Sequence, residues 1–372
     1  MAFIDILRKY RRFHDERQWQ SIDSARVEAV LRKSKLTLDD LPVLLSETAG
    51  AFLEDMAQRA AALTRKHFGS VISLFTPLYI SNYCRNRCPY CSFSNAFSIE
   101  RRQLTLEEIR REARVISDTG LRHILVLTGE DHRVADYTYI EQSLSVIADC
   151  FSAVGIEMYP LTEEQYGSLI AAGYVDSLTL YQETYNEELY RTLHTTGPKK
   201  DFVYRLEAID RACRKNIRSV TIGALLGLDD FRREVYCTAL HARYLQKQYP
   251  EVELTLSFPR IRPLVKEYVP RFPVTDKQLV QIITAFRLLF PTVGITLSTR
   301  ETPRFRDGVI PLGITKVSAG VSTAVGGHTE KPSTTQFEIA DHRSVEDMRL
   351  DLLKNGFQPV MHDWNMKMSV TG

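Results

Sequence analysis

The sequence lacks an excess of charge of either sign and lacks any long apolar run. Its 372 residues include 48 Lys and Arg against 46 Asp and Glu, a balance that predicts no general attraction to nucleic acid or to an anionic membrane. Charges are scattered through residues 1–19, which therefore have no uninterrupted apolar centre like that of a signal peptide. The apolar run at 254–264 is broken by Pro259 and Arg260, so it cannot span a membrane. We expect a soluble, cytoplasmic protein.

Cysteine is scarce, with six residues in the whole chain. In a reducing compartment these residues are expected to be thiols or metal ligands, because structural disulfides are disfavoured there. Cys150, Cys213 and Cys237 are far apart and lie in the apolar faces of predicted helices. We expect all three to be core residues, since a buried free cysteine behaves as a small hydrophobic side chain.

Internal repeats and low-complexity tracts are also absent, and the first ~65 residues contain few β-branched side chains. Apolar spacing predicts helices there. From Val71 onward, apolar runs that suit strands alternate with amphipathic stretches that suit helices. The eight runs are 71–80, 123–130, 156–161, 177–184, 219–228, 253–260, 294–301 and 315–320.

Eight strand–helix repeats predict a (β/α)₈ TIM-type barrel with parallel strands. A doubly wound open sheet is the alternative, because the last connection, 302–313, is only weakly helical in pattern. Among the helices, one is expected to start at a capping box formed by Thr105 and Glu108 and to close at Gly120. We divide the chain into an N-terminal helical extension (1–69), a barrel (70–320) and a C-terminal extension (321–372).

The remaining three cysteines lie close together in the segment CRNRCPYC, at Cys84, Cys88 and Cys91. The segment follows the first predicted strand, which places it at the mouth of a barrel, where catalytic groups collect. Three thiolates can bind three irons of a [4Fe–4S] cluster and leave the fourth iron open to a small molecule. A structural Cys₃His zinc site is the alternative, although His67 and His123 are poorly placed for it. Three core cysteines are disfavoured, because polar residues lie between them.

The segment CRNRCPYC resembles the CxxxCxΦC signature of radical S-adenosylmethionine (SAM) enzymes. Six further segments are similar to the ThiH family of tyrosine lyases within that superfamily: YQETYNEELY, LGLDDFRREVY, SFPRIRP, LSTRE, QFEIADHRS and GFQPVMHDW. The resemblance implies cleavage of the Cα–Cβ bond of L-tyrosine to 2-iminoacetate (dehydroglycine) and p-cresol for thiamine thiazole biosynthesis. It also implies a [4Fe–4S] cluster held by the three cysteines, and SAM as the source of 5′-deoxyadenosine and methionine.

The resemblance further implies a set of SAM-binding residues. Tyr90 stands where family members contact adenine. Gly129 and Glu130 correspond to the family's GGE element, which meets the SAM amino group; Thr128 replaces its first glycine. Glu183 and Arg205 stand where relatives hold the ribose hydroxyls and the methionyl carboxylate. The alternative for these charged residues is an ordinary loop carboxylate or a solvated helix charge.

The implied substrate is an amino acid with a carboxylate, which a guanidinium fork binds in two places. Arg300 ends the seventh predicted strand and is our candidate for that role, with Ser318 on the eighth strand as a further hydrogen-bonding group. An ion pair between Arg300 and Glu301 is the alternative. No residue can be assigned from the sequence to the phenol of tyrosine.

The resemblance implies a thiazole synthase (ThiG) as protein partner and a flavodoxin- or ferredoxin-type electron donor. Three other interpretations compete with the tyrosine lyase of thiamine synthesis. HydG, the tyrosine lyase of hydrogenase maturation, carries extra cysteines near its C-terminus, whereas the last cysteine here is Cys237. A tryptophan lyase of the same architecture is a second interpretation, and a non-enzymatic zinc or iron–sulfur protein is the third.

Overall fold

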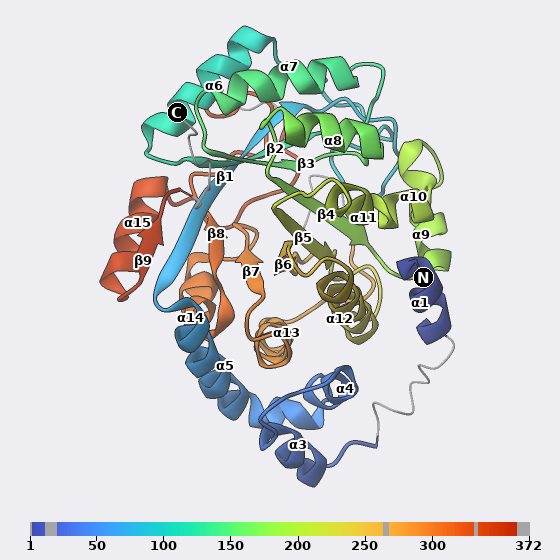
Figure 1. Cartoon of the computed structure of the whole chain (residues 1–372), viewed down its shortest axis with the longest axis vertical. Coiled ribbons are helices and arrows are strands. Elements are labelled where there is room, and N and C mark those ends of the chain that lie inside the picture. Colours follow the sequence, from blue (N-terminus) through green and yellow to red (C-terminus); the bar gives the residue numbers. More distant parts are fainter. Residues whose placement is uncertain (1, 12–20, 263–267, 331–333, 363–372) are drawn as a thin grey trace.

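A closed ring of parallel strands forms the centre of the protein (Figure 1). The computed structural model describes residues 2–11, 21–262, 268–330 and 334–362. The eight strands of the ring are β1 (Val71–Ser81), β2 (His123–Thr128), β3 (Ala153–Glu157), β4 (Ser177–Glu183), β5 (Ser219–Ala224), β6 (Glu253–Ser257), β7 (Gly294–Leu297) and β8 (Lys316–Ser318). Because β1 pairs with both β2 and β8, the sheet closes on itself. The predicted (β/α)₈ barrel is confirmed, and the open sheet is wrong.

Helices surround the ring and follow the strands as the sequence pattern predicts. They are α6 (Leu106–Asp118), α7 (Tyr137–Ala148), α8 (Glu163–Ala171), α9 (Glu187–Leu193), α10 (Phe202–Leu206), α11 (Ala208–Cys213), α12 (Phe231–Gln248), α13 (Asp276–Leu289) and α14 (Pro303–Gly313). The capping box at Thr105 and Glu108 is present at the start of α6, and Gly120 follows its end with φ +91°. The weak last connection forms α14, with Thr302 as its cap and Pro303 in its first turn.

The structure shifts one predicted strand and adds detail between β4 and β5. The strand predicted at 156–161 lies at 153–157, because its pairing with β2 begins at Ala153 and Pro160 has no N–H to donate. The helical segment before β5 is divided into two helices, α10 and α11, separated at Glu207, where ψ is 0°. The segment between β4 and α10 contains α9 and a short 3₁₀ turn (Pro198–Lys200).

The N-terminal helices cover the outer side of the barrel rather than its floor. They are α1 (Phe3–Arg11), α3 (Ser24–Leu31), α4 (Leu41–Leu44) and α5 (Leu53–Phe68), with 3₁₀ turns at Leu38–Asp40 and Thr48–Phe52. Helix α5 packs against α13 and α14, and α1 packs against α12 (Figure 1). Val27 and Leu44 of this region belong to the same buried cluster as the strands, so the extension shares the core of the barrel.

After the ring, the chain forms α15 (Val345–Lys354) and a ninth strand, β9 (Gln358–Val360). Strand β9 pairs in parallel with the first residues of β1. Ser73 pairs with Lys316 of β8 and also with Val360 of β9, so β9 lies on the edge of β1 that faces away from β8. This strand was not predicted from the sequence, because it is only three residues long.

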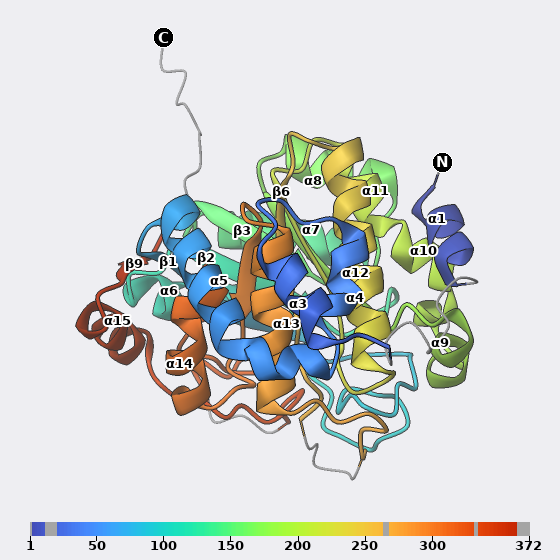
Figure 2. The ribbon, with the colours of Figure 1, turned by 90° about the horizontal axis from the view of Figure 1, so that it is seen from below.

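The loops that follow the carboxyl ends of the strands gather on one side of the barrel, at the bottom of Figure 2. In this family of architectures that side carries the functional groups. Of the remaining cysteines, Cys213 is buried, and Cys150 and Cys237 are half-buried against apolar clusters, as expected. No helix in the described part of the chain is long and apolar enough to cross a membrane.

Candidate functional site

The three clustered cysteines lie in the loop that follows β1, as the sequence predicts. Hydrogen bonds hold this loop in a fixed shape. The Arg101 guanidinium donates to the carbonyl oxygens of Asn82 (2.6 Å), Phe93 (2.8 Å) and Ser94 (2.9 Å). The Asn82 N–H donates to the Arg102 carbonyl at 3.0 Å, which ties the start of the loop to its end. The thiols therefore belong to a braced loop at the mouth of the barrel.

The surroundings of the sulfur atoms oppose thiolate formation in the absence of a cation. Burial raises the pKa of Cys88 to about 12, although the Lys199 ammonium lowers it in part. Burial also raises the pKa of Cys91 to about 11, and the neighbouring Cys84 adds to the effect. A bound metal deprotonates such thiols outright, because its charge compensates the thiolates. Proton release on metal uptake is the expected consequence.

The donor set suits a cluster better than a single ion. Within the described ranges, no three His, Cys, Asp or Glu side chains converge so that they could hold one metal ion. A Cys₃His zinc site requires such convergence. Three thiolates that each bind a different iron of one cluster do not require it. The donor set of the loop, three cysteines and no histidine, therefore suits three irons of one cluster better than a Cys₃His zinc ion.

Gly129 and Glu130 lie at the end of β2, directly against the cysteine loop. A Cβ atom at Gly129 would stand 2.3 Å from the Tyr83 carbonyl oxygen, so only glycine allows this approach of the two backbones. Glu130 is buried, and its carboxylate accepts a hydrogen bond from the Asn86 amide at 2.5 Å. Glu130 is therefore a buried, hydrogen-bonded carboxylate and is not exposed to solvent.

Asn86, between the first two cysteines, was missed by the sequence reasoning. Its side-chain oxygen accepts a hydrogen bond from the backbone N–H of Lys199 at 3.0 Å, while its side-chain NH₂ group donates one to the Glu130 carboxylate. The residue thus connects the cysteine loop to the end of β2 and to the segment after β4. An asparagine in a polar loop gives no sequence signal for such a role, because both partners are remote in the chain.

Glu183, the last residue of β4, forms the centre of a buried charged group. Its carboxylate bonds to the Lys199 ammonium at 2.5 Å and lies 3.5 Å from the Arg205 guanidinium. Burial alone raises the pKa of a carboxyl group, but Lys199 and Arg205 outweigh burial and lower the pKa of Glu183. Glu183 has φ +68°, a strained conformation for a residue with a side chain. Strain of this kind is typical of functional positions.

Arg205 is also buried, and its Nε donates to the Tyr181 carbonyl at 2.9 Å. The interpretation of Arg205 as a solvated helix charge is therefore wrong. Lys199 was missed, because it lies in a segment that the sequence presents as an ordinary loop. The structure brings together Glu183 and Arg205, which the resemblance assigns separately to SAM binding, and adds Lys199 from the segment between β4 and α10.

Tyr90 is held by a histidine that stays neutral. Burial, with the nearby Lys199 charge, lowers the pKa of His194 to about 3. The Nδ1 atom lies 2.9 Å from the Tyr190 carbonyl, which can only accept, so Nδ1 carries the proton. Nε2 therefore accepts the hydrogen bond from the Tyr90 hydroxyl at 2.6 Å. This bond and an edge contact with the Tyr268 ring fix the Tyr90 side chain at the cavity wall.

A cavity of about 1050 Å³, measured out to its opening, occupies the barrel interior beside these groups. Of the residues predicted from the sequence, five line it: Tyr90, Cys91, Glu183, Arg300 and Ser318. The others, Cys84, Cys88, Gly129, Glu130 and Arg205, do not line the cavity. Cys88, Glu130 and Arg205 are each buried beside it. The predicted residues thus include five that line the cavity and three that are buried behind its wall.

Arg300 faces the cavity and does not pair with Glu301. Glu301 instead binds the guanidinium groups of Arg260 and Arg262, so the predicted alternative for Arg300 is wrong. The Arg300 guanidinium stacks on the Phe337 ring at 3.5 Å, and burial lowers its pKa. Ser318 accepts a hydrogen bond from the Thr299 N–H at 3.2 Å. A guanidinium at a cavity wall is suited to bind a carboxylate.

Comparisons with known proteins agree with this geometry. Residues 78–238 match the model of the Radical SAM superfamily, and residues 257–358 match that of the Biotin and Thiamin Synthesis associated domain. The chain is 42% identical to 2-iminoacetate synthase of Escherichia coli K12 over 344 residues, which is 92% of this chain and 91% of the relative. It is 27% identical to 3-methylornithine synthase of Methanosarcina barkeri, over 71% of this chain and 73% of the relative.

Solved structures show the same architecture. The crystal structure of HydG, a maturase of the [FeFe]-hydrogenase, superposes with a TM-score of 0.84 and 32% identity over 96% of this chain and 79% of that chain. Methylornithine synthase (PylB) superposes with a TM-score of 0.72 and 22% identity over 90% and 97%, a likeness that concerns the fold alone.

Proposed function

Because the chain belongs to the 2-iminoacetate synthase family of radical SAM enzymes, we propose that it is a carbon–carbon lyase that cleaves the Cα–Cβ bond of L-tyrosine. The products are 2-iminoacetate and p-cresol, with 5′-deoxyadenosine and methionine as co-products. The reaction supplies the thiazole branch of thiamine biosynthesis. The 42% identity along nearly the whole of both chains carries this conclusion, and the cysteine loop beside a charged cavity agrees with it.

When bound, a [4Fe–4S] cluster and SAM supply the 5′-deoxyadenosyl radical. Cys84, Cys88 and Cys91 are the proposed cluster ligands, supported by the braced loop that carries all three. A cluster with one open iron is what a SAM-binding site requires.

For SAM we propose a site formed by Tyr90, Gly129, Glu130, Glu183 and Arg205. The first reason is position, since all five surround the cysteine loop or the adjoining cavity wall. The second is charge. The positive charges of Lys199 and Arg205 lower the pKa of Glu183 and so favour its ionised form. An ionised carboxylate accepts hydrogen bonds from hydroxyl groups such as those of a ribose. Arg205 offers a guanidinium to a carboxylate.

For tyrosine we propose that Arg300 binds the carboxylate and that Ser318 adds a hydrogen bond. Both line the cavity, and the guanidinium makes no ion pair or hydrogen bond with a described residue that would compete with a ligand. A cavity with aromatic and aliphatic walls also keeps water from the reacting atoms.

Two partners follow from the chemistry of the reaction. An electron donor is required, and we propose a flavodoxin or ferredoxin type. The imine product hydrolyses readily, so direct transfer to a thiazole synthase (ThiG) protects it. We also propose that residues 1–69, 70–320 and 321–372 act as extension, catalytic barrel and second extension.

Anaerobic reconstitution with iron, sulfide, SAM and dithionite tests the function, with tyrosine and tryptophan supplied in parallel. We expect 5′-deoxyadenosine and p-cresol with tyrosine only. Cys88→Ala is expected to abolish both products and the brown chromophore, whereas Cys150→Ala, a matched substitution outside the loop, keeps them. Absence of both products from the wild type would reject the proposal, and turnover of tryptophan alone would point to the other lyase.

A further inference from the structure

One carboxyl group in the cavity has no role in the proposed site. Glu157 is the last residue of β3, and its side chain lines the cavity. Among the described residues, no hydrogen-bond donor or ion-pair partner binds its carboxyl group. A charged group left unpartnered in a confined site costs free energy, so its presence there calls for a ligand that supplies a donor.

The position of Glu157 relative to Arg300 suggests which part of a ligand it meets. In the ring of eight strands, β3 and β7 are four strands apart in either direction, so they are opposite walls of the barrel. Arg300 follows β7, and Glu157 ends β3. The carboxylate and the amine of an amino acid share one carbon atom and must lie together near Arg300. The opposite wall therefore meets the far end of the side chain, which in tyrosine is the phenol.

The walls between these two residues suit an aromatic ring. Tyr79 of β1, Leu127 of β2 and Tyr181 of β4 line the same cavity. Leu127 pairs with Glu157 in the β2–β3 ladder, so apolar surface lies directly beside the carboxyl group. An apolar wall with one polar group at its end is the usual form of a selective pocket.

The two tyrosine hydroxyl groups that the Glu157 charge affects most form hydrogen bonds with other residues. The Tyr79 hydroxyl bonds to the Gln336 amide oxygen at 2.7 Å, and the Tyr181 hydroxyl bonds to the Ser257 hydroxyl at 2.9 Å. The Glu157 charge is the foremost electrostatic influence that raises the pKa of each of these tyrosines, after burial. Glu157 is thus near both phenols and bonded to neither, which leaves its oxygens for a ligand.

Burial raises the pKa of Glu157 to about 7. The other charged groups that act on it are Arg300, Arg205 and Lys199, which favour its charged form, and Glu183, which opposes it. The hydrogen bond to a phenol does not depend on this balance. A carboxylate accepts it through either oxygen, and a carboxylic acid accepts it through its carbonyl oxygen.

We propose that Glu157 accepts a hydrogen bond from the phenol hydroxyl of tyrosine and so selects tyrosine over phenylalanine. This inference rests on the proposed function, and it names the group that recognises the side chain. A site that expects a hydroxyl rejects a ligand without one, because its buried acceptor is then left unpaired.

The test uses the reconstituted enzyme with SAM, kept anaerobic and without reductant, so that binding is measured without turnover. Isothermal titration compares three ligands: L-tyrosine, L-phenylalanine, which lacks the hydroxyl, and 4-hydroxyphenylpropionate, which lacks the amine. Glu157→Leu removes the acceptor at similar volume, and Glu157→Gln keeps an acceptor oxygen. Glu107→Gln, an exposed residue of α6, is the matched control.

In Glu157→Leu we expect the affinity for tyrosine and for 4-hydroxyphenylpropionate to fall roughly 10- to 100-fold, the range for one hydrogen bond to a charged group. The affinity for phenylalanine stays unchanged or rises. Glu157→Gln is expected to lose less than Glu157→Leu, and Glu107→Gln nothing. If Glu157→Leu does not fold, Glu157→Gln tests the inference instead. Its affinity for the two ligands that carry a hydroxyl group is then expected to fall by a smaller factor, and its affinity for phenylalanine is not expected to fall.

Equal losses for tyrosine and phenylalanine, with 4-hydroxyphenylpropionate unaffected, would assign Glu157 to the amine and overturn the inference. Unchanged affinities in both variants would overturn it as well. Failure of the proposed function gives a different result, namely no p-cresol from the reductant-activated wild type. If Glu157→Leu still produces p-cresol and still prefers tyrosine to phenylalanine as strongly as the wild type, the role of Glu157 is refuted and the proposed function stands.

Discussion

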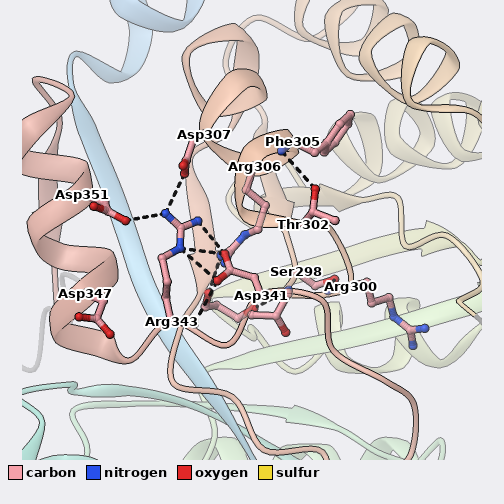
Figure 3. A network of polar contacts seen from close by, with 12 residues as sticks. Ser298, Arg300, Thr302, Phe305, Arg306, Asp307, Asp341, Arg343, Asp347 and Asp351 are labelled. Carbon is pink, nitrogen blue, oxygen red and sulfur yellow. Dashed lines mark hydrogen bonds and ion pairs between the residues drawn. The ribbon is translucent and has the colours of Figure 1, made fainter.

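Arg306 and Asp341 form an ion pair in which neither side chain has any exposed surface. The Arg306 guanidinium also donates to the Ser318 carbonyl at 2.5 Å, so the pair reaches the last strand of the barrel. Asp341 binds Arg343 at 2.6 Å, and Arg343 continues to Asp307 and Asp351 (Figure 3). The network thereby joins α14, β8 and α15.

This network supports the wall that carries the candidate substrate residues. The Thr299 carbonyl accepts hydrogen bonds from the N–H groups of Ala340 (2.8 Å) and Asp341 (3.2 Å), and Thr299 in turn donates to Ser318. Arg300 comes directly after Thr299, and its side chain points away from the network (Figure 3). Asp341 is therefore a positioning residue for Arg300 and Ser318.

Asp341→Asn is expected to destabilise the protein and to weaken tyrosine binding. The substitution leaves the buried Arg306 guanidinium without a counter-charge, a loss of roughly 3–5 kcal/mol in comparable cases. Thermal unfolding and the KM for tyrosine measure the two effects, and the KM for SAM is expected to change less. Asp307→Asn removes a carboxylate of the same network that is 40% exposed, so its expected cost is below about 1 kcal/mol. Equal losses in the two variants would contradict a special role for the buried pair.

Arg300→Lys is expected to raise the KM for tyrosine by roughly 10- to 100-fold. Lysine keeps the positive charge but cannot form the two parallel bonds that a guanidinium makes with a carboxylate. Tyramine, which has no carboxylate, provides the check by titration on the reconstituted enzyme. Its affinity is expected to be the same for wild type and variant. A parallel loss of tyramine affinity would mean that Arg300 shapes the cavity rather than binding the carboxylate.

Gly129→Ala is expected to displace the cysteine loop and to lower the iron content after reconstitution. The new methyl group would lie 2.3 Å from the Tyr83 carbonyl oxygen, a contact that the backbone must relieve by moving. Iron and sulfide analysis with the visible absorbance of the cluster measures the outcome. Gly308→Ala is the matched control, because Gly308 lies in α14 with no atom within 4 Å of the added carbon. There the substitution is expected to stabilise by about 0.5–1 kcal/mol. Normal iron content in Gly129→Ala would show that the close approach is not required.

The parts of the site that the sequence predicts are local in the chain. The spacing of Cys84, Cys88 and Cys91 can be recognised in the sequence because one loop carries all three. The barrel is readable because each strand and helix has its own periodicity. The resemblance to a known family adds Glu130, Glu183 and Arg205 by position, and the structure finds each of them buried beside the cavity or in its wall.

The parts that the sequence does not predict depend on contacts between remote segments. Asn86 lies 44 residues from Glu130 and 113 from Lys199, and no periodicity marks such pairs. Glu157 stands near the start of the predicted strand 156–161, whereas in the structure it ends β3, and only the closure of the ring sets it opposite Arg300. Strand β9 is too short to show a pattern, and it is specified by its pairing with β1. Long-range geometry of this kind is fixed by packing rather than by local propensity.

Glu157→Gln is expected to stabilise the protein more at pH 8 than at pH 5. The pKa of Glu157 is raised from its ordinary value of 4.5 to about 7, so between these values the folded state binds a proton that the unfolded state has released. The stability of the wild type therefore falls as the pH rises from about 4.5 to about 7, since the buried carboxyl must ionise. A neutral glutamine removes this penalty, and the gain on going from pH 5 to pH 8 is on the order of 1–3 kcal/mol. Urea unfolding of the protein without cluster at both pH values measures it, with Glu107→Gln, whose side chain is 81% exposed, as the control substitution. Parallel stability curves for wild type and Glu157→Gln would show that the carboxyl titrates at its ordinary pKa, in water that fills the cavity rather than in a desolvated pocket.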